Sequence, residues 1–112
     1  MEKRNLNDYT EECYSIAKEK GWYDSNQDTI FTKLLLVHAE ISEAVEELRK
    51  GKDPTEIYFS EGGKPEGFPI EIIDAYIRMF DLCKKWNVDL DKAYQLKTEY
   101  NKSRPYRHGK KV

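Results

Sequence analysis

Residues 69–86 are the most constraining segment of the chain, because apolar side chains cover most of the circumference of the helix that they predict. At about 100° per residue, only a narrow strip of this helix is polar. That strip consists of Glu71, Asp74, Arg78 and Asp81. Other helices are needed to cover a segment of this kind, and its acids lie in surroundings that solvated surface acids seldom have. The segment therefore predicts a helical domain built around residues 69–86.

Three further helices are predicted, the first two from apolar residues that recur at every third or fourth position and the last from its start at Asp89 after Val88. They are residues 8–20 with Asn7 as the cap, residues 29–50 with Gly51 as the end, and residues 89–102. Pro105 blocks any continuation of the last helix. The chain thus has four predicted helices.

The connection between the second and third helices, residues 51–68, is long and has no helical period. It holds four of the six glycines and two prolines, which favour a loop with an ordered turn at residues 63–67. No segment alternates strongly enough to predict a strand, although residues 56–59 could form a short extended piece. Residues 1–112 are therefore predicted to form one all-α domain, a four-helix bundle-like fold with a basic tail at residues 103–112.

The composition fits a folded domain and weighs against several classes of protein. Hydrophobic residues make up 38% of the 112 residues, and 19 basic residues nearly balance 21 acidic ones. This slightly acidic balance weighs against a nucleic-acid partner despite the basic tail. The longest strongly apolar stretch, residues 34–37, is far shorter than the roughly 20 residues that cross a bilayer. With no secretory signal and only Cys13 and Cys83, we expect a cytoplasmic protein with reduced cysteines and no membrane contact.

Two pairs of acidic residues repeat one spacing on successive predicted helices. Glu40 and Glu43 are three residues apart, as are Glu71 and Asp74, so each pair shares one helix face. Adjacent carboxylates repel one another unless positive charge lies between them. All-oxygen ligation suits Mg²⁺, with Mn²⁺ as a substitute. A strip neutralised by Arg78 explains the same residues, and the spacing alone leaves both interpretations open.

These acids lie within longer motifs. Residues 36–47 contain Glu-x-x-Glu, residues 63–67 read Gly-Lys-Pro-Glu-Gly, and residues 71–74 read Glu-Ile-Ile-Asp. Together they resemble the MazG-like all-α nucleoside triphosphate pyrophosphohydrolases, and the resemblance extends from about residue 21 through the tail.

The resemblance implies that the chain hydrolyses a nucleoside or deoxynucleoside triphosphate to the monophosphate and pyrophosphate, as part of nucleotide-pool housecleaning. It implies that Glu40, Glu43, Glu71 and Asp74 hold Mg²⁺. Many relatives carry a glutamate where this chain has Ala39, so the family's general base is not carried over. We expect Glu40 or Glu43 to accept the proton of the attacking water.

Lys97, Asn101 and Arg104 fall at positions i, i+4 and i+7, on one face of the last helix and its exit. The resemblance places a similar set near the substrate, where these side chains would bind phosphate oxygens or the sugar. The alternative is a solvated basic helix end, which is favoured for Lys110 and Lys111.

Two more residues are candidates for substrate binding. Lys33 could approach the phosphates, although a surface position on its helix is the commoner outcome for a lysine. Trp22 could stack on a base, or it could belong to the core.

The wide apolar surface of residues 69–86 predicts a homodimer, or a homotetramer built from dimers. The same surface supports a rival function, a non-catalytic helical module for self-association or partner binding. Stabilisation by Mg²⁺ distinguishes the enzyme from the module.

Overall fold

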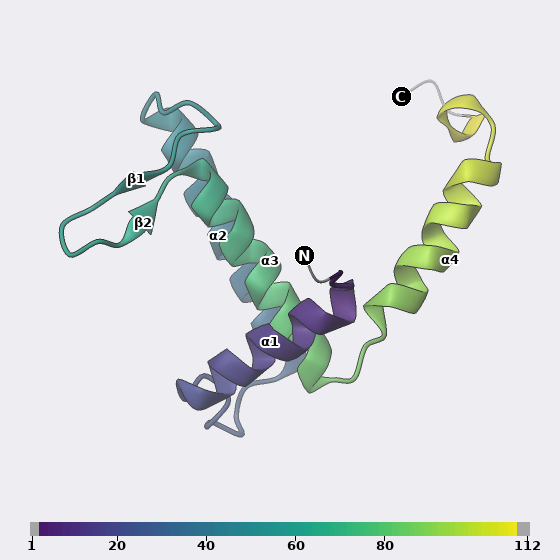
Figure 1. Cartoon of the computed structure of the whole chain (residues 1–112), viewed down its shortest axis with the longest axis horizontal. Helices are drawn as coiled ribbons and strands as arrows, with labels where there is room; N and C mark the ends of the chain where they lie inside the picture. Colours follow the sequence, from purple (N-terminus) through teal and green to yellow (C-terminus); the bar gives the residue numbers. More distant parts are fainter. Residues whose placement is uncertain (1–2, 110–112) are drawn as a thin grey trace.

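A computed structural model describes residues 3–109 as four helices with a small hairpin (Figure 1). The helices are α1 (Leu6–Glu19), α2 (Ile30–Arg49), α3 (Phe68–Lys85) and α4 (Leu90–Ser103). The all-α class is confirmed, and no helix in this part of the chain is long and apolar enough to cross a membrane. Of the predicted tail, residues 106–109 form a 3₁₀ helix, while Lys110 and Lys111 lie outside the described residues.

Helices α1, α2 and α3 form one packed unit, in which α3 contacts both of the others. The core is small and is centred on Val37, Ala75 and Leu82. Ala75 and Leu82 of α3 are buried and most of its other residues are half-buried, so the expectation that this helix is mostly covered holds only in part for the single chain. The reason is that two helices cover two sides of α3 and leave a third side open, where Tyr76 is 48% exposed.

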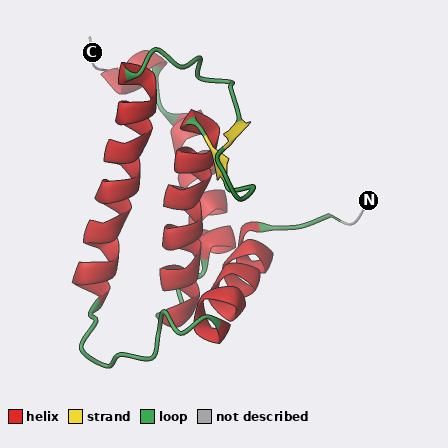
Figure 2. Ribbon diagram, turned by 90° about the vertical axis from the view of Figure 1, so that its left-hand side faces the viewer, coloured by secondary structure: helices red, strands yellow, loops and turns green. Residues whose placement is uncertain are grey.

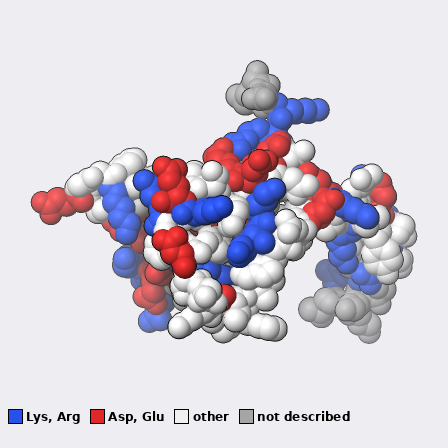
Figure 3. All heavy atoms as spheres, turned by 90° about the horizontal axis from the view of Figure 1, so that it is seen from below, with Lys and Arg blue, Asp and Glu red and all other residues white. Residues whose placement is uncertain are grey.

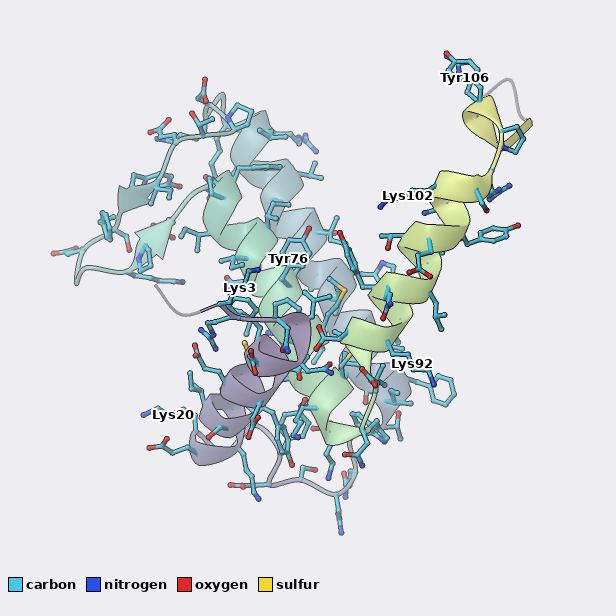
Figure 4. The ribbon with its side chains drawn as sticks, turned by 45° about the vertical axis from the view of Figure 1, so that its right-hand side comes forward. Lys3, Lys20, Tyr76, Lys92, Lys102 and Tyr106 are labelled. Carbon is cyan, nitrogen blue, oxygen red and sulfur yellow. The ribbon has the colours of Figure 1, made fainter. Side chains whose placement is uncertain are left out.

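Helix α4 projects away from this unit (Figures 1 and 2). Its main contact is with α1, none of its residues is buried, and Lys102 and Tyr106 lie at its far end (Figure 4). The radius of gyration is 17.0 Å, whereas a compact domain of this length has about 13 Å. A single chain therefore forms a three-helix unit with a projecting helix, and the expected packing of four helices is not met within it.

Helices α1 and α4 cap each other where they meet. The Asp91 carboxylate accepts from the backbone N–H of Leu6 at 2.9 Å, and the Asn7 side-chain oxygen accepts from the N–H of Leu90 at 3.0 Å. The prediction that Asn7 caps α1 is wrong, because Asn5, two residues earlier, is the N-cap and forms a capping box with Asp8. Asn7 instead lies in the first turn of α1 and caps α4.

The connection between α2 and α3 contains an antiparallel hairpin, β1 (Tyr58–Phe59) and β2 (Pro65–Glu66). The extended piece expected near residues 56–59 is therefore part of a two-stranded sheet. The Tyr58 hydroxyl donates to the buried Glu47 carboxylate at 2.8 Å, which fastens the hairpin to α2. Gly67, with a φ of 123°, then starts α3, and a Cβ there would lie 2.3 Å from the Glu56 carbonyl oxygen. Only glycine fits this junction.

Candidate metal centre

Three of the four predicted acids converge where α2 packs against α3. Glu40, Glu43 and Glu71 each place a carboxylate oxygen within 4.8 Å of the others. The three-residue spacing puts Glu40 and Glu43 on adjacent turns of α2, and the start of α3 brings Glu71 opposite them. The structure therefore joins residues that are far apart in the sequence into one acidic cluster.

The surroundings of Glu71 disfavour its ionised form. Burial and the nearby carboxyl groups of Glu43, Asp74 and Glu40 raise the pKa of Glu71 from 4.5 to about 7. Its Oε2 atom is buried and has no hydrogen-bond partner among the described residues. A buried oxygen in this state is destabilising unless a proton or a cation compensates it.

Asp74, the fourth predicted acid, lies beside the cluster rather than in the converging group. Burial and the charge of Glu40 raise its pKa, while Arg78 and Lys64 oppose that shift. Its coupling to Glu40 and Glu43 places it within electrostatic reach of the same centre.

Arg78 neutralises part of the negative charge of the acidic cluster, as the salt-bridge interpretation predicts. Its Nε donates to Glu40 Oε1 at 2.6 Å, and the Glu40 side chain is 10% exposed. No ion pair reaches Glu43 or Glu71 within residues 3–109. The salt-bridge interpretation therefore accounts for Glu40 but leaves the excess negative charge at Glu43 and Glu71.

The predicted phosphate-binding residues of α4 do not join the cluster within one chain. Lys97, Asn101 and Arg104 lie on the projecting helix, and the charged groups of Lys97 and Arg104 are each 5.3 Å from the centre of the Tyr100 ring. Within a single protomer they form a separate basic and aromatic surface.

Lys33 and Trp22 instead lie together, near the acidic cluster. The Lys33 ammonium donates to the Trp22 carbonyl oxygen at 2.9 Å and lies 3.5 Å from the Asp28 carboxylate. Lys33 is buried, so a solvated surface position is wrong for it, and Trp22 is 63% exposed, so it is not a core residue.

Both residues line a cavity of about 380 Å³ that also reaches Glu40 and Asp74. On its wall, the Tyr23 hydroxyl donates to Asp81 Oδ1. Burial raises the pKa of both groups, and the charges of Lys33 and Arg78 oppose this at Asp81. The sequence places Asp81 in the polar strip of α3, but it carries no signal that pairs Asp81 with a tyrosine 58 residues away.

Comparisons with protein-family models, with curated proteins and with solved structures found no match to this chain. The resemblance to the MazG-like enzymes therefore stays a prediction from motifs. What the structure adds to it is the convergence of the acids and the adjoining cavity.

Proposed function

We propose that this chain is a Mg²⁺-dependent hydrolase that converts a nucleoside or deoxynucleoside triphosphate to the monophosphate and pyrophosphate. The observation that carries the proposal is the convergence of Glu40, Glu43 and Glu71, with a buried Glu71 oxygen that has no partner in the described part of the chain. Acids arranged in this way favour a hard divalent cation, for which Mn²⁺ can substitute. Housecleaning of the nucleotide pool is the role that we propose for this activity.

The donor set fits Mg²⁺ because every available ligand is a carboxylate oxygen and the cluster carries excess negative charge. Glu40, Glu43 and Glu71 would hold the ion, with Asp74 beside them. When bound, Mg²⁺ neutralises phosphate oxygens and lowers the barrier to attack by water.

The proposed general base is Glu43. Arg78 already occupies one oxygen of Glu40, which makes that carboxylate the poorer proton acceptor of the two on α2. Glu43 is exposed, so water can reach it, and one of its carboxylate oxygens lies within 4.8 Å of oxygens from Glu40 and Glu71. In this role Glu43 takes the proton of the attacking water as the phosphoanhydride bond breaks.

We also propose that the enzyme acts as a homodimer or as a homotetramer built from dimers. The chain exposes 9036 Å², roughly 2,600 Å² more than the about 6,450 Å² expected for a compact monomer of 13.3 kDa. An excess of this size matches the area that obligate dimers bury. The apolar residues that contribute to it line the outer face of α2 and the length of α4: Phe31, Leu34, Leu35, Ile41, Val45, Leu48, Tyr94, Leu96 and Tyr100.

Association of two copies would also give the basic residues of α4 a place to act. A helix that packs on a second copy can carry Lys97, Asn101 and Arg104 to the acidic cluster of that copy. Acidic and basic side chains are intermixed over the face in Figure 3, with uncharged surface between them. A symmetric contact between copies is compatible with this mixture because neither sign of charge dominates it.

The reaction is tested by incubating the purified protein with a panel of canonical and modified nucleoside triphosphates and deoxynucleoside triphosphates, in Mg²⁺ or in EDTA. We expect a monophosphate and pyrophosphate in Mg²⁺ and neither product in EDTA. Release of inorganic phosphate with a diphosphate would contradict the proposed bond cleavage, and no turnover across the panel would contradict the enzyme.

A non-catalytic module for self-association or partner binding is the second candidate, because α2 and α4 expose long apolar faces. It predicts assembly without any effect of Mg²⁺. A melting temperature that is unchanged by millimolar Mg²⁺, with and without a triphosphate, would favour this candidate over the enzyme.

A further inference from the structure

The cavity beside the acidic cluster has two chemically distinct parts. Apolar side chains of α1 and α3 form one part, namely Cys13, Ile16, Ala17 and Ile77. The exposed ring of Trp22 borders them. Glu40 and Asp74 belong to the lining as well, so the cavity is continuous with the proposed metal centre. Its volume of about 380 Å³ falls in the range of small-molecule sites.

Asp81 is the polar group set into this lining. One of its oxygens, Oδ1, accepts the hydrogen bond from Tyr23, whereas Oδ2 accepts none from any residue that the structure describes. Asp81 is half-buried, so an unused acceptor there favours a ligand that brings a donor.

Tyr23 is itself held in place, which fixes the orientation of the Asp81 carboxylate. The edge of Tyr14 packs against the Tyr23 ring at a centroid distance of 5.1 Å. The Lys33 ammonium lies 4.4 Å from the centre of the same ring. With these contacts, the hydroxyl is directed at Oδ1 before any ligand arrives.

Building on the proposed function, we propose that the nucleotide base occupies this cavity and that Asp81 selects bases that carry an exocyclic amino group. An ionised carboxylate only accepts hydrogen bonds. It pairs with the amino group of cytosine or adenine, and it repels the carbonyl oxygen that uracil presents at the equivalent position. Trp22 offers a ring on which any base can stack, so selectivity is assigned to Asp81 and affinity to Trp22.

Cytosine and uracil give the sharpest comparison because they differ in the group at a single ring position. We expect the chain to bind cytidine monophosphate at least about tenfold more tightly than uridine monophosphate, since the wrong base leaves a carboxylate facing a carbonyl. Quenching of tryptophan fluorescence measures both affinities without turnover, and Trp22→Phe identifies the signal that comes from the cavity. The ratio of kcat/KM for dCTP and dUTP gives the same preference during turnover.

The variants separate Asp81 from its support. In Asp81→Asn, the Tyr23 hydroxyl can still donate to the side-chain oxygen, which leaves an amide N–H₂ as a donor toward the base, so the preference is expected to shift toward uracil. Tyr23→Phe keeps the carboxylate but frees its orientation, so the preference is expected to shrink without reversing. Asp53→Asn is the matched control, because within residues 3–109 the Asp53 carboxylate accepts hydrogen bonds from Thr55 alone, in the loop after α2.

The outcomes distinguish this inference from the proposed reaction. Selective binding that Asp81→Asn abolishes or reverses supports the inference, even if no triphosphate is hydrolysed and the proposed reaction fails. Hydrolysis with equal affinity for the two monophosphates overturns the inference and leaves the reaction standing. A preference that Asp81→Asn leaves unchanged in a folded variant, or no binding of either nucleotide, also overturns it.

Discussion

Glu43 and Glu71 face each other across the α2–α3 contact with carboxylate oxygens within 4.8 Å, and Oε2 of Glu71 is buried without a hydrogen-bond partner in the described structure. Two ionised carboxylates this close repel each other, so a proton or a cation between them is stabilising. A divalent cation is therefore expected to compete with a proton for this pair.

The stability of the metal-free chain is expected to fall as the pH rises from about 4.5 to about 7. The pKa of Glu71, about 7 in the folded chain against an ordinary 4.5, means that the folded state binds more protons between these values. The free energy of unfolding should decrease by about 1 kcal/mol across that window, after discounting the shift for solvent screening. Urea unfolding in EDTA at several pH values measures it. Glu71→Gln should lessen the decrease, and an identical pH dependence in this variant would contradict the assignment.

Millimolar Mg²⁺ is expected to raise the melting temperature at neutral pH, because it binds the folded cluster in place of a proton. A concentration 100 times the dissociation constant would add about 2.7 kcal/mol. Glu43→Gln and Glu71→Gln should lose this response in a thermal melt. Glu46→Gln is the matched control, since Glu46 lies on the same helix and pairs with Arg49 outside the cluster. An equal Mg²⁺ response in all three variants would refute the site.

Turnover should fall in variants of the acidic cluster and persist in a variant outside it. Glu43→Ala and Asp74→Ala are expected to reduce kcat/KM by roughly 100-fold or more while the helical circular dichroism signal survives. Glu46→Ala should stay within about twofold of the unmodified chain. Activity retained in both cluster variants would remove Glu43 and Asp74 from the proposed mechanism.

Sedimentation at micromolar concentration is expected to give at least twice the mass of one chain. A charge on the outer face of α2, as in Val45→Glu, should shift the chain toward monomers, because Val45 is 49% exposed within one protomer and would be buried by a partner. Phe59→Glu, on the hairpin, is the control, since Phe59 is also exposed, at 68%. A purely monomeric unmodified chain would argue against the dimer and against any site completed by a partner.

Mixing two inactive variants tests whether α4 acts on a second copy. A Glu43→Gln chain keeps its α4 and a Lys97→Ala chain keeps its acids, so a mixed dimer would hold one intact site if α4 reaches across. Random exchange would then restore about a quarter of the full activity. No recovery from a mixture shown to contain mixed dimers would indicate that Lys97 acts within its own chain or not at all.

Much of the helical framework could be predicted because its signals are local. Thr29, Gly51 and Asp89 mark helix ends through hydrogen bonds or backbone angles that involve only their neighbours. Asn7 is not the cap of α1 because Asn5, two residues earlier, takes that position and pairs with Asp8 in a capping box. The two-residue strands of the hairpin are too short to produce a detectable alternation.

The candidate site, too, could be predicted only where its sequence signals are local. Regular helix spacing indicates that Glu40 and Glu43 share a face, and the structure brings Glu71 to them. No sequence period reports that Tyr23 reaches Asp81, because that contact depends on how a loop crosses the end of α3. The placement of α4 also escaped prediction, since an apolar helix face looks the same whether its own chain or another covers it.

The hydrogen bonds between the first turns of α1 and α4 hold the projecting helix at one end. Its 14 residues span about 21 Å, so a tilt of about 10° at the capped end would move the far end by roughly 4 Å. Asn7 and Asp91 lie at the held end of α4, and Arg104 lies at its opposite end. A substitution at Asn7 would thus change the tilt of α4 and so displace the distant side chain of Arg104.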